Sequence, residues 1–271
     1  MQPLLFKNID WNLMWQNAVK KKTRKSKGPD DWDKRAPSFA RRNVHSIYNR
    51  MFLDLLQPEP EWTVLDVGCG PGTLSIPLAK RVRHVSALDF SPQMLKIIEE
   101  RAGKEQIANI STHTLSWEDD WREHGIRVHD VTIASRSIGV RDLRAALEKL
   151  NRYARKAVAV TDRVGPGPLD PAAFKAVGRE LETGPDYIYT VNLLYQMGIH
   201  ATVNFIRLEH SRPYGSFAEA VDNYTWMFRD LTDEEHKRLE KYVRSIAEDD
   251  GNTIILRPQH VTTWAFLRWS P

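Results

Sequence analysis

Residues 64–72 read VLDVGCGPG, and this segment constrains the fold more than any other part of the chain. A short apolar run ends in glycines at positions 68, 70 and 72, and a helix-like run, TLSIPLAKRV, follows. The pattern predicts a buried strand, a tight glycine turn and a helix, in that order. Glycine suits such a turn because it adopts left-handed dihedrals and lets a ligand approach the backbone. The backbone N–H groups at the start of the helix favour a polar or anionic ligand.

A second apolar run, VSAL at 85–88, ends at Asp89. A carboxylate at the end of such a strand can accept hydrogen bonds from the two hydroxyl groups of a ribose. The dinucleotide fingerprint G-x-G-x-x-G does not fit, because the frame that starts at Gly68 ends at Thr73. The alternative without a ligand is an ordinary turn between strand and helix, followed by an ordinary strand-terminal aspartate.

The pattern that does fit is D-x-G-x-G-x-G, with Asp66 two residues before the first glycine. It resembles motif I of the class I S-adenosylmethionine (SAM)-dependent methyltransferases, and DFSPQML at 89–95 is similar to the segment after their second strand. The resemblance implies that Asp89 holds the ribose, Phe90 packs on the adenine and Met94 closes the pocket. It also implies a set of residues that line the methionine end of the cofactor: Asp66, Gly68, Cys69, Gly70 and Gly72.

Two further segments follow predicted strands and extend this resemblance. In LSWEDDW at 115–121, Glu118 is the predicted partner of the adenine amino group, and Trp117 is predicted to lie beside the ring. Asp119 or Asp120 could take the role of Glu118, and a solvated acidic turn is the alternative without a ligand.

In ASRSIG at 134–139, the main chain near Ser135 is predicted to face the methyl group of SAM. Arg136 beside it could reach an anionic substrate or the SAM carboxylate, or it could be an ordinary surface arginine. Cys69 is interpreted as a small residue of the turn rather than a nucleophile, because no basic partner is identifiable.

Strand and helix patterns alternate from residue 62 to residue 163, which predicts a parallel α/β sheet with helices on both faces. The resemblance implies a Rossmann-like class I methyltransferase sheet of seven strands in the order 3-2-1-4-5-7-6. The predicted domains are an N-terminal helical cap (1–60), a SAM-binding core (61–210, with 261–271 as its last strand) and a helical insertion or lid (211–260).

Composition restricts the class of protein further. The chain has 271 residues, 41% of them hydrophobic, which is enough for a sizeable core. It has no apolar run long enough to cross a membrane and no signal-peptide pattern, so we expect a cytoplasmic protein with no membrane partner. One cysteine excludes a disulfide framework, and the spacing of the nine histidines predicts no metal site.

The N-terminal region is rich in aromatic residues and basic charge. Trp11, Trp15, Trp32, Phe39 and Tyr48 precede the first strand, and they could cover a ligand or pack permanently on the sheet. KKKTRKSK at 20–27 could contact a phosphate-rich polymer, although a solvated linker is favoured because no aromatic residue is interleaved with the charges.

The sequence therefore predicts a SAM-dependent methyltransferase that releases S-adenosyl-L-homocysteine (SAH). A small-molecule acceptor is favoured because a cap and a lid would enclose a pocket. The alternatives are an RNA or protein methyltransferase, with nucleic acid weakly indicated by the basic run, and a SAM-binding protein without catalysis. No residue identifies itself as a general base, although four flank the expected site: His45, Tyr48, Asp162 and Tyr195. The acceptor atom and the oligomeric state are not encoded in any recognisable pattern.

Overall fold

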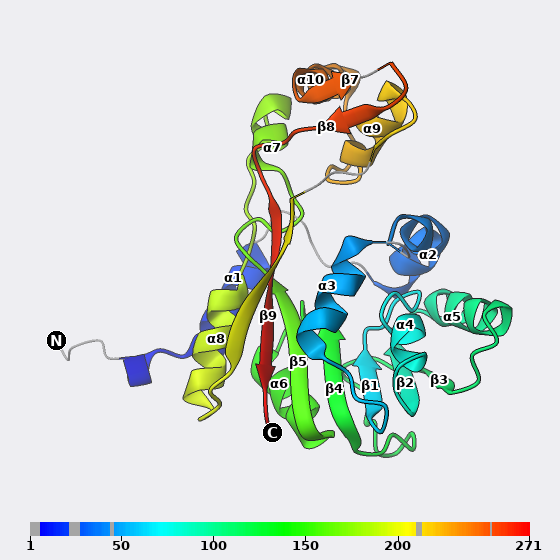
Figure 1. The fold of residues 1–271 in the computed structure, drawn as a ribbon. Coiled ribbons are helices and arrows are strands. Elements are labelled where there is room, and N and C mark those ends of the chain that lie inside the picture. Colours follow the sequence, from blue (N-terminus) through cyan, green and yellow to red (C-terminus); the bar gives the residue numbers. More distant parts are fainter. Residues whose placement is uncertain (1–5, 22–27, 44–45, 210–212, 250) are drawn as a thin grey trace.

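A mixed sheet of seven strands forms the centre of the molecule (Figure 1). The computed structural model describes residues 6–21, 28–43, 46–209, 213–249 and 251–271. The sheet strands are β1 (Thr63–Val67), β2 (His84–Asp89), β3 (Ile110–Thr114), β4 (His129–Ser135), β5 (Ala154–Arg163), β6 (Thr202–Leu208) and β9 (Thr262–Trp269). Their order is β3-β2-β1-β4-β5-β9-β6, and only β9 runs antiparallel to its neighbours. This confirms the predicted α/β class and strand order.

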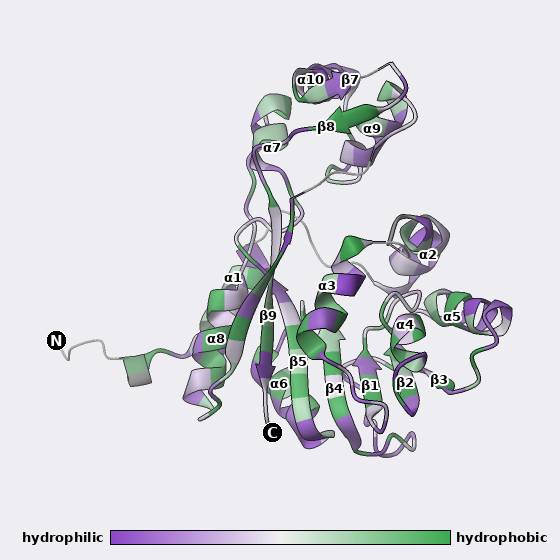
Figure 2. Cartoon of the chain, viewed as in Figure 1, coloured by the Kyte–Doolittle hydropathy of each residue, from purple (hydrophilic) through white to green (hydrophobic). Residues whose placement is uncertain are grey.

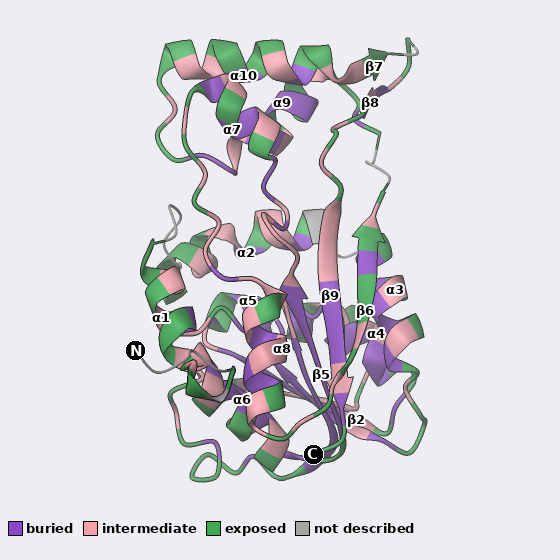
Figure 3. Cartoon of the chain, turned by 90° about the vertical axis from the view of Figure 1, so that its left-hand side faces the viewer, coloured by how far each residue is buried: buried purple, intermediate pink, exposed green. Residues whose placement is uncertain are grey.

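Helices cover both faces of the sheet. One face packs against α1 (Trp11–Lys21), α6 (Leu143–Arg152) and α8 (Tyr187–Gln196). The other packs against α3 (Ile47–Leu56), α4 (Ser75–Ala79) and α5 (Pro92–Lys104). Strand residues alternate between the two clusters because successive side chains point to opposite faces, so Leu65 joins the first and Val64 the second. Figure 2 shows hydrophobic residues along the strands, and Figure 3 shows the central strands buried and the edge strand β6 largely exposed.

The predicted cap of residues 1–60 is divided among several positions. A short 3-10 helix, η1 (Phe6–Asn8), precedes α1, and α2 (Pro29–Asn43) precedes α3. Helix α1 contacts α6 and α8, whereas α3 lies against the opposite face of the sheet and α2 contacts α5. Trp15 on α1 is only 2% exposed, and its indole N–H donates to the Val140 carbonyl oxygen at 2.9 Å. Trp15 on α1 and Tyr48 and Phe52 on α3 are therefore core residues, whereas the aromatic residues of α2, Trp32 and Phe39, belong to none of the core clusters.

A separate apolar cluster forms a lobe beyond the carboxyl ends of the parallel strands (Figure 1). Its elements are α7 (Pro171–Val177), α9 (Phe217–Thr225), α10 (Asp233–Ser245), β7 (Ala247–Asp249) and β8 (Ile254–Leu256). Its interior polar anchor is Asp170, whose Oδ2 accepts the Tyr242 hydroxyl at 2.6 Å and the Tyr224 hydroxyl at 3.3 Å. The lobe thus combines the predicted insertion with α7, which lies earlier in the chain.

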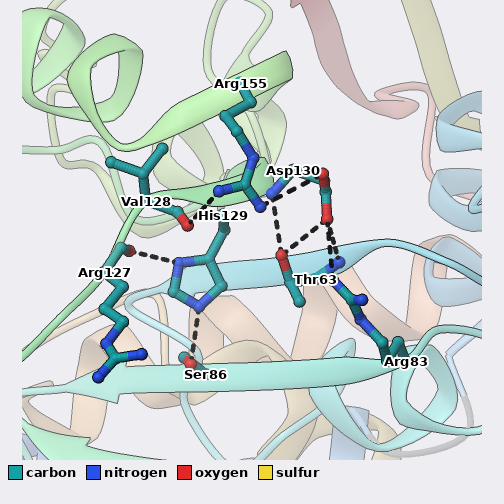
Figure 4. Close-up of polar contacts among 8 residues, drawn as sticks. All are labelled: Thr63, Arg83, Ser86, Arg127, Val128, His129, Asp130 and Arg155. Carbon is teal, nitrogen blue, oxygen red and sulfur yellow. Dashed lines mark hydrogen bonds and ion pairs between the residues drawn. The ribbon is translucent and has the colours of Figure 1, made fainter.

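The amino ends of the strands are held by a polar cluster (Figure 4). Asp130 Oδ2 accepts from both the backbone N–H and the hydroxyl of Thr63 at 2.8 Å, and Arg155 lies 3.4 Å from Oδ1. His129 contacts the Ser86 hydroxyl oxygen through Nε2 at 2.8 Å. These contacts tie β4 to β1, β5 and β2 at the edge opposite the glycine turn.

Candidate functional site

The glycine turn after β1 adopts dihedrals that favour glycine. Gly68 and Gly70 have φ values of +67° and +55°. A Cβ added at Gly68 would lie 2.4 Å from the Cβ of Ser137, whereas one added at Gly70 would meet nothing closer than Phe39, at 3.9 Å. Gly68 is therefore required for close packing against the segment after β4, whereas Gly70 is favoured by its positive φ and not by a steric clash.

The carboxylate of Asp89 organises this turn. Its Oδ2 accepts the N–H of Gly70 at 2.8 Å, and its Oδ1 accepts the N–H of Ser91 at 2.9 Å. The side chain is 7% exposed, and burial raises its pKa above the usual range for an aspartate. Because each carboxylate oxygen has a second lone pair, Asp89 can still accept hydrogen bonds from a ligand.

Asp66 lies beneath the same turn. It is 1% exposed, and its Oδ2 accepts the Ser75 hydroxyl at 2.6 Å. Burial raises the pKa of Asp66 to about 7, and the nearby Asp89 charge adds to the shift. A cationic ligand group close to Asp66 would favour its ionised form and would bind more tightly as that form becomes populated.

A cavity of about 520 Å³ opens at the carboxyl ends of β1, β2 and β4, where ligands bind in parallel α/β sheets. All but one of the predicted site residues line it: Asp66, Gly68, Cys69, Gly70, Asp89, Phe90, Met94, Trp117, Glu118 and Ser135. Gly72 is the exception, because it packs against Ile98 and Ile76 beneath the turn. Sequence motifs thus identified residues that the fold brings together, although their contact with a cofactor remains a prediction.

The acidic segment after β3 presents one of its three carboxylates to the cavity. Glu118 lines the cavity beside Trp117. Asp119 instead accepts the backbone N–H and the hydroxyl of Ser116 through Oδ2, which lowers its pKa, and Asp120 accepts the N–H of Arg122. The two alternative acids are therefore engaged in local turns, and Glu118 is the one placed for a ligand.

Helix α2 covers part of the cavity. Trp32 and Phe39 line it, and their rings meet edge to face with centroids 5.4 Å apart. Asp33 between them accepts the Ser91 hydroxyl at 2.5 Å, at the N-terminus of α5. Since Ser91 follows the ribose-binding candidate Asp89 by two residues, α2 is attached at the rim of the site.

The segment after β4 contributes a buried hydroxyl network. The Tyr48 hydroxyl lies 2.7 Å from both the Ser135 and the Thr161 hydroxyl oxygens. Arg136 has a φ of +58°, its N–H donates to Thr161 Oγ1 at 3.0 Å, and its guanidinium lies 4.2 Å from the centre of the Tyr48 ring. Arg136 and Ser137 line the cavity, but the sequence carried no signal for this arrangement because Tyr48, Ser135 and Thr161 are far apart along the chain.

The three candidate bases that the structure describes do not line the cavity. Tyr48 is fully buried, and burial raises its pKa. Asp162 faces Thr190 on α8, whose hydroxyl donates to it at 2.8 Å, and burial raises the pKa of Asp162 to about 6. Tyr195 is 57% exposed on α8. His45 lies outside the described residues, as do residues 22–27 of the basic run.

The described part of the chain shows neither a metal-binding cluster nor a membrane-spanning helix. Its histidine, cysteine, aspartate and glutamate side chains form no cluster that could hold a metal ion. None of its helices has the length and apolar character needed to span a membrane.

Comparison with known proteins decides the family. Residues 64–157 match the family model described as a methyltransferase domain. The chain belongs to the class I SAM-dependent methyltransferases. It is 36% identical over 245 residues to an uncharacterised protein of Haemophilus influenzae, and the match covers 89% of each chain.

More distant methyltransferases match parts of the same core. The 23S rRNA (uracil(1939)-C(5))-methyltransferase RlmD of Klebsiella pneumoniae is 32% identical over 81 residues, which are 28% of this chain and 19% of that protein. The crystal structure of a methyltransferase candidate from Bacillus halodurans superposes with a TM-score of 0.55 at 12% identity, covering 82% of this chain and 97% of that one. This structural likeness concerns the fold alone.

Proposed function

We propose that the cavity binds SAM and that the protein transfers its methyl group to a small-molecule acceptor. The observation that carries the proposal is the convergence of the glycine turn, Asp66, Asp89 and the Trp117–Glu118 segment on one cavity. Its volume of about 520 Å³ falls within the range of cofactor sites, roughly 300–1,000 Å³. The open side of Gly70 provides a backbone surface that a side chain would block.

Residues at the carboxyl ends of three neighbouring strands would hold SAM. Asp89 on β2 would accept the ribose hydroxyl groups, with Phe90 and Met94 against the adenine. Glu118 would accept the adenine amino group, and the turn with Asp66 would hold the methionine part. When bound, SAM supplies an electrophilic sulfonium methyl group, so the protein contributes orientation and the exclusion of water.

The aromatic wall that encloses part of the cavity favours a small-molecule acceptor. Trp32 and Phe39 form an aromatic wall of the cavity, and aromatic walls are typical of small-molecule sites. An RNA acceptor is supported less, because the similarity to RlmD is confined to 28% of the chain. The protein's own nucleic-acid indication, the run 20–27, lies mostly outside the described residues.

Calorimetry with SAM, SAH and NAD tests the cofactor. We expect SAM and SAH to bind and NAD to give no heat; NAD binding without SAM binding would overturn the proposal.

Tritiated methyl transfer from labelled SAM into fractionated cell extract tests the acceptor. Label in a low-molecular-weight fraction supports the small-molecule proposal, whereas label in RNA or protein would replace it. SAM binding with no labelled fraction would favour a non-catalytic SAM-binding protein.

A further inference from the structure

Arg136 is a cation in the cavity without a carboxylate partner. Among the described residues, no ion pair includes it. Asp66 and Asp89 line the same cavity, but the short contacts of their carboxylates are made to Ser75 and to the turn and not to Arg136. Arg136 is partly buried, and this desolvation lowers its pKa. A cation that is partly withdrawn from water is stabilised when an anionic group pairs with it.

The position of this guanidinium is fixed from two sides. The backbone of Arg136 adopts φ +58°, which is uncommon for a residue other than glycine. Its backbone N–H donates to Thr161 Oγ1 at 3.0 Å. The guanidinium stacks on Tyr48, whose hydroxyl is bound by Ser135 and Thr161. Strained backbone of this kind persists where surrounding contacts enforce it, and it is common at binding sites. Arg136 is thus held in one arrangement at the wall of the cavity that it lines.

The location relative to the cofactor indicates which ligand it serves. In the sheet order, β4 lies between β1 and β5, and Asp89 on β2 lies on the far side of β1. The anchors of Arg136, Thr161 on β5 and Tyr48 on α3, lie on the β5 side. A cofactor that extends from β2 over the β1 turn would direct its methyl end towards β4. Arg136 therefore lies beyond that end, where an acceptor must approach.

We propose that Arg136 pairs with an anionic oxygen group, a carboxylate or a phosphate, on the methyl acceptor. The proposal rests on the proposed function, since it assumes that SAM occupies the β1–β2 part of the cavity. A guanidinium forms two parallel hydrogen bonds to either group, so the shared chemistry is that of an oxyanion. The aromatic residues of α2 line the same cavity and suit an acceptor with an apolar body.

Calorimetry on the SAH-saturated protein tests this pairing. The probes are benzoate and phenyl phosphate, with benzamide as the uncharged control. We expect at least one anion to bind the wild type at least about tenfold more tightly than benzamide does, and Arg136→Met to remove that preference. Arg136→Lys should retain part of it. Arg127→Met provides the matched control, because Arg127 is exposed at the opposite end of β4 and should leave the preference unchanged. Whichever of benzoate and phenyl phosphate binds more tightly indicates whether the acceptor carries a carboxylate or a phosphate.

Two results would overturn the proposal. In the first, neither anion binds wild type more tightly than benzamide does. In the second, Arg136→Met weakens SAH itself at least about tenfold, while the decarboxylated analogue of SAH binds both proteins equally; Arg136 would then hold the cofactor carboxylate. If SAH does not bind the wild type at all, the proposed function fails by itself, and the anion titrations on the free protein still decide whether Arg136 is an oxyanion site. Circular dichroism confirms that each variant is folded.

Discussion

At the residue scale, Asp89 holds the glycine turn and is the predicted partner of the ribose. Its carboxylate joins Gly70 to Ser91, so removal of the side chain would disturb the turn as well as a ribose contact. Asp89→Asn keeps one acceptor oxygen and removes the charge. We expect SAM affinity in calorimetry to fall at least about tenfold, because charge-assisted hydrogen bonds contribute about 1.5–3 kcal/mol each. Glu123→Gln, on an exposed loop, is the control. Unchanged affinity in folded Asp89→Asn would place the ribose partner elsewhere.

The two glycines at the start of the turn should respond differently to alanine. At Gly68 the added methyl group overlaps Ser137, so Gly68→Ala should lower the free energy of unfolding by about 3 kcal/mol. Ser137→Gly in that background should recover part of the loss. Gly70→Ala should cost only about 1 kcal/mol of stability but should weaken SAM, because its methyl group enters the cavity. Urea unfolding and calorimetry separate the two effects. Normal SAM binding by Gly70→Ala would make that glycine purely structural.

Much of the candidate site was predictable because its residues belong to continuous motifs. The glycine turn and the Asp89 segment each follow a strand directly, so their place at the cavity follows from topology. The position of Arg136 over the Tyr48 ring was not predictable in the same way. It depends on Tyr48, Ser135 and Thr161, which meet only after α3 and β5 have packed. Such contacts leave no periodic pattern in one sequence.

At the scale of elements, the attachment of α2 can be tested through one side chain. Asp33 accepts the Ser91 hydroxyl, so Asp33→Ala should loosen α2 from the N-terminus of α5. We expect tryptic cleavage within 29–43 to become several-fold faster while the free energy of unfolding falls by only about 1 kcal/mol. Bound SAM should slow the cleavage. Asp31→Ala, an exposed acid on the same turn of helix, is the matched control. Equal protease sensitivity of the two variants would show that Asp33 does not attach the helix.

Trp32 on the same helix distinguishes a covering role from a structural one. If α2 shields the site, Trp32→Ala should reduce methyl transfer about tenfold or more with little change in melting temperature, since a lid excludes water and completes a site. If Trp32 only packs, activity and melting temperature should fall together. Trp15→Ala gives the comparison, because that indole is buried in the core and its loss should lower the melting temperature strongly.

Elements with strong periodicity were predicted well, and short elements were not. Strands β1 to β5 and their helices follow the alternating pattern closely. The start of α3 has a local signal in Ser46, whose hydroxyl accepts the Tyr48 N–H as an N-cap. The β7–β8 pair was missed because strands of three residues show too little alternation to recognise.

At the scale of the whole molecule, buried ionisable groups give stability two opposing dependences on pH. Burial raises the pKa of Asp66 to about 7 and that of Asp162 to about 6. Burial also lowers the pKa of three histidines on the sheet below their ordinary value of 6.5: His84, His113 and His129. The raised carboxyl groups stabilise the fold fully below their unfolded pKa, about 3.9, and this contribution is lost as the pH rises through 6 to 7. The histidines stabilise above 6.5 and lose their contribution as the pH falls below it.

These trends partly cancel in the wild-type chain, and Asp66→Asn should separate them. In the wild type, release of the Asp66 proton lowers the free energy of unfolding as the pH rises. Asp66→Asn has no such proton to release, so it does not show this loss. Its free energy of unfolding relative to wild type should therefore rise by about 2 kcal/mol between about pH 5 and pH 8, at about 1.4 kcal/mol per pH unit within the titration range. Urea unfolding at several pH values measures this difference, and Glu123→Gln controls for net charge. A difference that stays constant with pH would mean that Asp66 ionises in its usual range.

The same group should link stability to ligand binding. SAM is cationic at its sulfonium and ammonium groups, and if its methionine part lies near Asp66, it favours the ionised carboxylate. Wild-type SAM affinity should then increase as the pH rises from about 6 to 8, because the Asp66 carboxyl ionises through its pKa of about 7. SAH lacks the sulfonium charge and should show a smaller increase. In Asp66→Asn, calorimetry should find this pH dependence abolished for both ligands. Equal pH dependence in wild type and variant would place the cationic end of the cofactor away from Asp66.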